Sequence, residues 1–105
     1  MKIRLLHIDE CPNWADAEVR LRAALDELGL SDIPIAVELL ATPEDTIGTA
    51  FAGSPTIEVD GTDLFPSGGA TNDLACRVYR TPTGLAGLPT QEQVVEALRA
   101  RVERS

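Results

Sequence analysis

The spacing of hydrophobic and polar positions changes several times along the chain, and each change marks an expected element. Residues 2–8, "KIRLLHI", form a short apolar run that is typical of a buried strand. From Trp14 to Leu28 the apolar residues recur at helical spacing, and Gly29 follows as a helix stop. Residues 33–40, "IPIAVELL", alternate in the manner of a strand. The first part of the chain therefore predicts a strand, a helix and a second strand.

The second part continues this alternation. Pro43 after Thr42 predicts a short helix that ends near residue 53. Residues 56–61, "TIEVDG", predict a third strand that closes on an Asp-Gly turn, and 74–80, "LACRVYR", a fourth. Thr90 and Gln93 form a capping box before the last amphipathic helix. The order β-α-β-α-β-β-α over residues 1–105 predicts one α/β domain, with a mixed four-stranded sheet covered by helices.

Composition and charge narrow the classes of function. The chain has 105 residues, of which 44% are hydrophobic and 25% charged, with a net charge of −8. Its few basic residues are scattered, which argues against a nucleic-acid partner. We see neither an apolar stretch of about 20 residues that would span a membrane nor a secretory leader, so we expect a cytoplasmic protein.

The clearest chemical signal is Cys11, which follows the first predicted strand within "CPNW". Pro12 favours the first turn of a helix, so Cys11 is expected at or next to the N-cap. Unpaired amides at a helix start stabilise a thiolate and lower its pKa, whereas the neighbouring carboxylates Asp9 and Glu10 oppose that effect. Cys11 is therefore the candidate catalytic nucleophile.

A second motif, "GSPT", precedes the third predicted strand and contains Ser54, Pro55 and Thr56. "CPNW" and "GSPT", in this strand context, resemble the thioredoxin superfamily. "ECPNW", "GSPT", "CRVYRT" and "GLAG-PT" are more narrowly similar to small bacterial thioredoxin-like proteins, some labelled alkylmercury lyase. The resemblance implies a thioredoxin-like fold with a cis-proline at Pro55 beside Cys11. It also implies that the backbone next to Pro55 can pair with a substrate chain.

The position where a two-cysteine motif of that family holds its resolving cysteine is occupied by Trp14. Trp14 begins the apolar helix stripe, which favours a core or rim residue over a substrate-stacking role. Cys76 is the possible second thiol. In a regular antiparallel fourth strand it would lie roughly 13 Å from Cys11, too far for a disulfide. With Leu74 and Val78 on the same face, we expect Cys76 to be a buried structural cysteine, unless the loop 62–75 folds back across the site.

Three functions remain open on these grounds. The favoured one is a mono-thiol, glutaredoxin-like thiol–disulfide oxidoreductase that acts through Cys11 on protein or small-molecule disulfides, with glutathione or another small thiol as co-substrate. The alternatives are a protein that binds soft metals or organomercurials, and a non-catalytic thioredoxin-like binding domain. No resident cofactor is expected. His7, Asp9 and Cys11 lack the spacing of a zinc site, so no resident metal is expected either.

Overall fold

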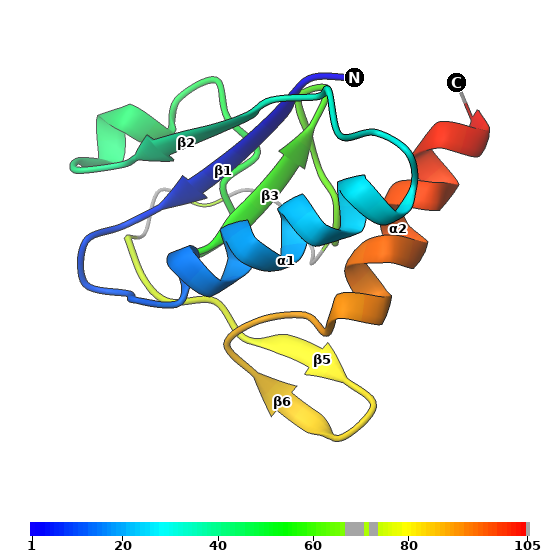
Figure 1. Cartoon of the computed structure of the whole chain (residues 1–105). Coiled ribbons are helices and arrows are strands. Elements are labelled where there is room, and N and C mark those ends of the chain that lie inside the picture. Colours follow the sequence, from blue (N-terminus) through cyan, green and yellow to red (C-terminus); the bar gives the residue numbers. More distant parts are fainter. Residues whose placement is uncertain (67–70, 72–73, 105) are drawn as a thin grey trace.

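The computed structural model describes residues 1–66, 71 and 74–104, and its centre is a mixed four-stranded sheet (Figure 1). The strands lie side by side in the order β2-β1-β3-β4. Their bounds are β1 Ile3–His7, β2 Ile35–Leu39, β3 Thr56–Val59 and β4 Thr62–Asp63. The predicted α/β class with a mixed sheet is confirmed.

Strand β1 lies at the centre of the sheet and has a neighbour on each side. It runs parallel to β2, with Ile3 opposite Ile35, and antiparallel to β3, with Leu5 opposite Ile57. The parallel pair needs a crossover, which the first helix provides. The order of the first three strands and the first helix therefore follows the sequence-based expectation.

Two α-helices cover one face of the sheet, and the local sequence signals correctly predict the end of the first and the start of the second. They are α1, Trp14–Glu27, and α2, Gln91–Arg104. Gly29 has a φ of 75° behind α1, and the amide of Leu30 donates to the carbonyl of Leu25 at 2.8 Å. The Thr90 amide donates to Gln93 Oε1 at 2.8 Å and the Gln93 amide to Thr90 Oγ1 at 3.1 Å, so the predicted capping box is present.

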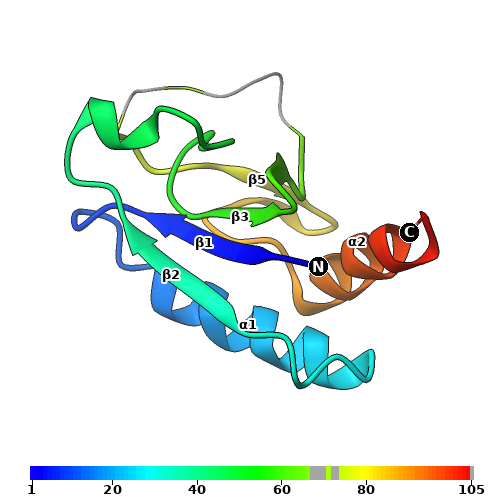
Figure 2. The same ribbon diagram turned by 90° about the horizontal axis from the view of Figure 1, so that it is seen from above.

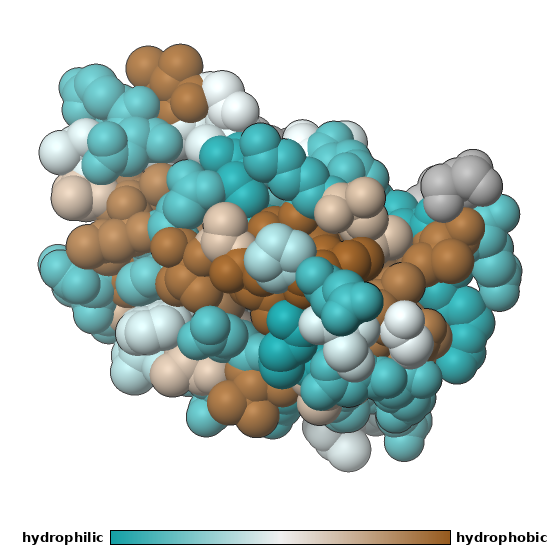
Figure 3. All heavy atoms as spheres, turned by 45° about the horizontal axis from the view of Figure 1, so that its top comes forward, coloured by the Kyte–Doolittle hydropathy of each residue, from teal (hydrophilic) through white to brown (hydrophobic). Residues whose placement is uncertain are grey.

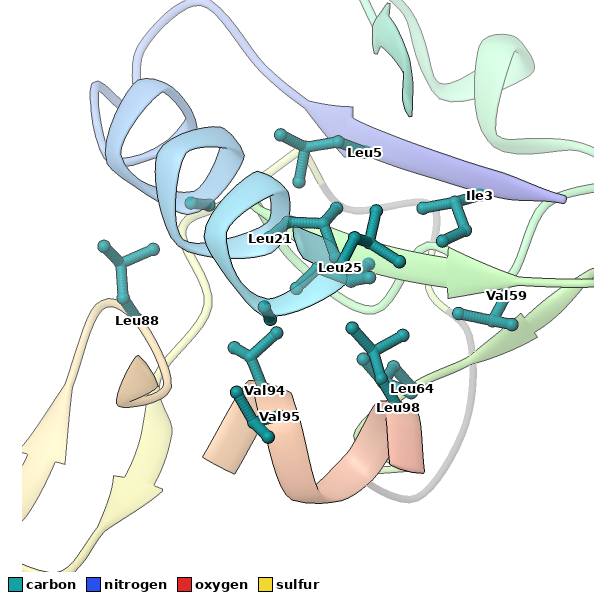
Figure 4. Close-up of a cluster of buried hydrophobic side chains, with 13 residues drawn as sticks. Ile3, Leu5, Leu21, Leu25, Val59, Leu64, Leu88, Val94, Val95 and Leu98 are labelled. Atoms are coloured by element: carbon teal, nitrogen blue, oxygen red, sulfur yellow. The ribbon is translucent and has the colours of Figure 1, made fainter. Parts of the chain in front are cut away.

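The main hydrophobic core lies between this face of the sheet and the two helices (Figure 4). Leu21 and Leu25 of α1 point toward the sheet, and Leu98 of α2 meets them from the side. All three side chains are 0% exposed. Burial of a leucine side chain stabilises a fold by roughly 1.5–3 kcal/mol, so this cluster holds the two helices against the sheet.

The opposite face of the sheet is covered by segments that are not α-helical (Figure 2). One is η1, Pro43–Thr46, a single 3₁₀ turn where the sequence predicts a helix that continues toward residue 53. The helix stops because Ile47 adopts an extended conformation and Gly48 a φ of 81°. Phe51, a few residues later, is 0% exposed beneath this layer.

The fourth strand is not the one that the sequence predicts. Asp60 and Gly61 have φ angles of 51° and 85°, and this tight turn leads directly into β4, where Thr62 pairs with Val59. The predicted strand 74–80 does not join the four-stranded sheet. Its last residues belong to β5, Tyr79–Thr81, which pairs only with β6, Gly84–Ala86, in a separate hairpin.

Apolar side chains also reach the surface. On the face seen in Figure 3 they form a band across the middle of the molecule, with hydrophilic side chains around it. Among the large apolar residues, Ile47 is 77% exposed and Leu85, in the β5–β6 hairpin, is 73% exposed. In the part of the chain that the structure describes, no helix has both the length and the apolar character needed to cross a membrane.

Candidate functional site

Cys11 lies in the turn between β1 and α1, and its side chain is buried. The N-cap of α1 is Asn13, so Cys11 stands two residues before the cap and not at it. Cys11 is 1% exposed. It belongs to a small apolar cluster on the sheet face opposite the main core, whose other members are Leu6, Ile8, Leu40 and Phe51.

Cys11 forms a disulfide with Cys76, and their Cα atoms are 5.9 Å apart. The expectation that Cys76 lies about 13 Å away was built on a regular antiparallel strand, and it is wrong. The two cysteine sulfur atoms are thus brought together, although 65 positions separate the cysteines in sequence.

The segment around Cys76 reaches Cys11 by running along Ser54. The Ser54 amide donates to the Ala75 carbonyl at 2.8 Å, and the Arg77 amide donates to the Ser54 carbonyl at 2.8 Å. These bonds make a parallel bridge between Ser54 and Cys76. β4 pairs with the outer side of β3, and the segment around Cys76 lies instead beside residue 54.

The two cysteines differ in their exposure to solvent. Cys11 is buried, whereas Cys76 is exposed together with Ala75 and Val78. The expectation of a buried structural Cys76 is therefore wrong. The inward-facing residues of this segment are Arg77 and Tyr79, which are 6% and 4% exposed.

Arg77 and Tyr79 face inward because each finds partners there. Arg77 pairs with Asp63 at 2.9 Å, donates to the Phe65 carbonyl and lies 4.4 Å from the centroid of the Tyr79 ring. The Tyr79 hydroxyl donates to the Pro55 carbonyl, and burial raises the pKa of Tyr79 above its usual value, so this hydroxyl stays protonated. These contacts anchor the chain on the C-terminal side of Cys76.

Burial is the largest influence on the pKa of Asp63, the partner of Arg77. It raises the pKa of the Asp63 carboxyl above its usual value, and the hydrogen bond from the Phe65 amide and the charge of Arg77 only partly offset this shift. Sequence analysis missed Asp63, Arg77 and Tyr79 as supports of the site. The alternation of Arg77 and Tyr79 with Cys76 and Val78 was the available signal, and it showed two faces without showing which one is buried.

Ser54, Pro55 and Thr56 lie directly beside Cys11. The carbonyl oxygen of Ser54 is 3.6 Å from Cys11 Sγ, and Ser54 Oγ accepts a hydrogen bond from the Ile8 amide at 3.0 Å. The Ser54–Pro55 peptide bond is cis. Thr56 Oγ1 accepts a bond from the Ala52 amide at 3.0 Å. The two sequence motifs therefore meet at one place, with Cys76 as the third component.

Gly53 is needed for the approach of the Cys76 segment, and substitution by alanine is expected to disturb it. Gly53 has a φ of 111°, and a Cβ atom there would lie 2.8 Å from Arg77 Cβ and 3.1 Å from Arg77 Cα. Gly53→Ala is therefore expected to lower the free energy of unfolding by about 1–3 kcal/mol, measured by urea denaturation.

Gly48→Ala is the matched control for Gly53→Ala. Gly48 has a φ of 81° but no atom within 4 Å of an added Cβ, so only the backbone term applies. Equal losses of stability in the two variants would contradict the proposed close contact with Arg77.

The remaining residues of "CPNW" shape the surface next to the disulfide. Pro12 is exposed in the turn before α1. Trp14 is partly buried, and its ring stacks on His7, with ring centroids 4.4 Å apart and planes 19° from parallel. Trp14 is thus a rim residue packed on the end of β1.

The described residues contain no group of three His, Cys, Asp or Glu side chains that could hold a metal ion. No protein family, curated protein or solved structure matches the chain. Function is therefore inferred from the geometry of the Cys11–Cys76 pair and its surroundings.

Proposed function

We propose that this protein is a thiol–disulfide oxidoreductase of thioredoxin-like architecture whose redox couple is Cys11–Cys76. The observation that carries the proposal is the pairing of a buried and an exposed cysteine beside Ser54–Pro55. A disulfide with one accessible sulfur can be exchanged by an external thiol, whereas a fully buried one resists exchange.

The arrangement of the elements supports the resemblance that the sequence motifs suggest. A parallel β1–β2 crossover through α1, an antiparallel β3 and a C-terminal helix follow the order expected of a thioredoxin-like domain. Cys11 follows β1, and the cis Ser54–Pro55 bond precedes β3, as that resemblance implies. Fold alone does not define an activity, so the proposal rests mainly on the sulfur pair.

The proposed reaction is a two-electron exchange. The two thiols of the reduced protein convert a substrate disulfide into two thiols, and the protein gains the Cys11–Cys76 bond in return. The reverse reaction oxidises a dithiol substrate. Because the second sulfur lies within the chain, the expected mono-thiol mechanism is replaced by an intramolecular one. We further propose cytoplasmic protein or small-molecule disulfides as substrates, with glutathione or another small thiol as co-substrate.

Stoichiometry with glutathione disulfide tests this function. One reduced wild-type chain is expected to consume one molecule of glutathione disulfide, release two of glutathione and end as the intramolecular disulfide. Cys11→Ser and Cys76→Ser are each expected to stop at a mixed disulfide and release one glutathione. Thiol titration and intact-mass spectrometry measure both products. A wild-type protein that also stops at the mixed disulfide would contradict the proposal.

A second candidate is the binding of a soft metal ion, which the same convergence of two sulfur atoms favours. Two thiolates match the ligand preference of Hg(II), and the "ECPNW" and "GSPT" motifs resemble proteins labelled alkylmercury lyase. Reduced protein would then bind one Hg(II) per chain through both cysteines, and each serine variant would weaken binding. Tight Hg(II) binding without oxidation by glutathione disulfide would favour this function over the oxidoreductase.

A further inference from the structure

We infer that Cys76, and not Cys11, is the sulfur that forms the mixed disulfide with a partner, and that Cys11 is the internal resolving thiol. This inference rests on the proposed oxidoreductase function and assigns the order of its two steps. It reverses the role that the sequence motif gives to Cys11.

The inference rests on the different exposure of the two cysteines to an external thiolate. A thiolate must approach the disulfide along the S–S axis, from behind the sulfur that it attacks, so the more accessible sulfur is the target. Cys11 is 1% exposed and belongs to the apolar cluster with Leu6 and Phe51. Cys76 is exposed, and its neighbours Ala75 and Val78 are exposed as well. Because residue Cys76 is exposed and residue Cys11 is buried, we expect an external thiolate to reach Cys76 Sγ and not Cys11 Sγ.

The electron and proton balance of the step follows from this geometry. The attacking thiolate forms a bond to Cys76 Sγ, the Cys11–Cys76 bond breaks, and Cys11 leaves with the electron pair as a thiolate that takes a proton from solvent. As a thiol, Cys11 has an acceptor in the Ser54 carbonyl oxygen, 3.6 Å from its sulfur. In the opposite direction the Cys76 thiolate attacks the substrate disulfide, and Cys11 then attacks Cys76 Sγ and releases the partner thiolate.

The contacts on both sides of Cys76 keep Cys76 close to Cys11 during the resolving step. The Ser54 amide donates to the Ala75 carbonyl, and the Arg77 amide donates to the Ser54 carbonyl. Arg77 is held in addition by Asp63. None of these bonds involves a sulfur atom, so they remain available when Cys76 carries a partner. Cys11 then lies next to the mixed disulfide, and resolution is intramolecular.

Single-cysteine variants test the assignment. Cys11→Ala leaves only the exposed thiol, and Cys76→Ala leaves only the buried one. In the native state, Cys76 in Cys11→Ala is expected to react with glutathione disulfide about tenfold faster, or more, than Cys11 in Cys76→Ala. In concentrated guanidinium the two rates are expected to fall within about threefold of each other, because both cysteines are then exposed. Native rates that are equal, or faster for Cys11, would overturn the inference.

A measurement on the wild-type protein avoids any effect of the substitutions on folding. Reduced protein is mixed with glutathione disulfide and quenched with acid within milliseconds to seconds, and the glutathionylated peptide is identified by mass spectrometry. Glutathione on Cys76 is expected, and glutathione on Cys11 would refute the assignment. Oxidation that proceeds through Cys11 leaves the proposed function standing, whereas the absence of any oxidation removes the function itself.

Discussion

Reduction of the Cys11–Cys76 disulfide is expected to lower the free energy of unfolding by about 4 kcal/mol. The bond joins positions 65 residues apart, and closing a loop of that length restricts the unfolded chain strongly. For a domain of this size each kcal/mol shifts the melting temperature by about 4–8 °C, so the reduced protein should melt at least roughly 15 °C lower. Denaturation in urea, with and without dithiothreitol, measures the difference.

A variant that lacks both cysteines is the control for this prediction. Cys11→Ala with Cys76→Ala should melt near the reduced wild-type protein and should not respond to dithiothreitol. A change of less than about 1 kcal/mol on reduction of the wild type would mean that the disulfide does not constrain the chain as proposed. A large difference would also give the protein two redox states of distinct stability, which proteolysis could distinguish.

Asp63→Ala is expected to be strongly destabilising, with a loss of about 3–5 kcal/mol in the free energy of unfolding. The Asp63 and Arg77 side chains are 12% and 5% exposed, and a guanidinium cannot release its proton. Removal of Asp63 therefore leaves a buried charge without its counter-ion. Because Arg77 adjoins Cys76, the loss should also slow closure of the disulfide. Equilibrium unfolding and the rate of oxidation by glutathione disulfide measure the two effects.

Two controls separate the ion pair from general effects of substitution. Glu96→Ala removes a partner of Arg99, but these side chains are 69% and 44% exposed, so a loss below about 1 kcal/mol is expected. Asp63→Leu with Arg77→Met removes both buried charges, and it should cost less than Asp63→Ala. Burial raises the pKa of Asp63 despite its pairing, so we expect the pair to fix the position of the chain more than to add stability. A double variant that is less stable than Asp63→Ala would contradict this view.

The sequence alone determined the elements whose signals are local. The helical stripe from Trp14, the Gly29 stop and the Thr90–Gln93 capping box depend on residues within a few positions of one another, and all are present in the structure. The α/β class followed from the order of these elements. The positions of "CPNW" after β1 and "GSPT" before β3 were also predictable, because each motif borders a strand with a clear apolar pattern.

Only the tertiary structure decided which face of residues 74–80 is buried and that Cys76 lies beside Cys11. The alternation of residues 74–80 shows two faces, and hydrophobicity favours burial of Leu74, Cys76 and Val78. The opposite face is buried because Arg77 meets Asp63 and the Tyr79 hydroxyl meets the Pro55 carbonyl, and both partners lie far away in sequence. β4 takes the place beside β3 that the sequence assigns to residues 74–80, and Ala75 and Arg77 bond to Ser54 instead. The redox pair therefore depends on long-range polar contacts, which a local hydrophobic pattern does not encode.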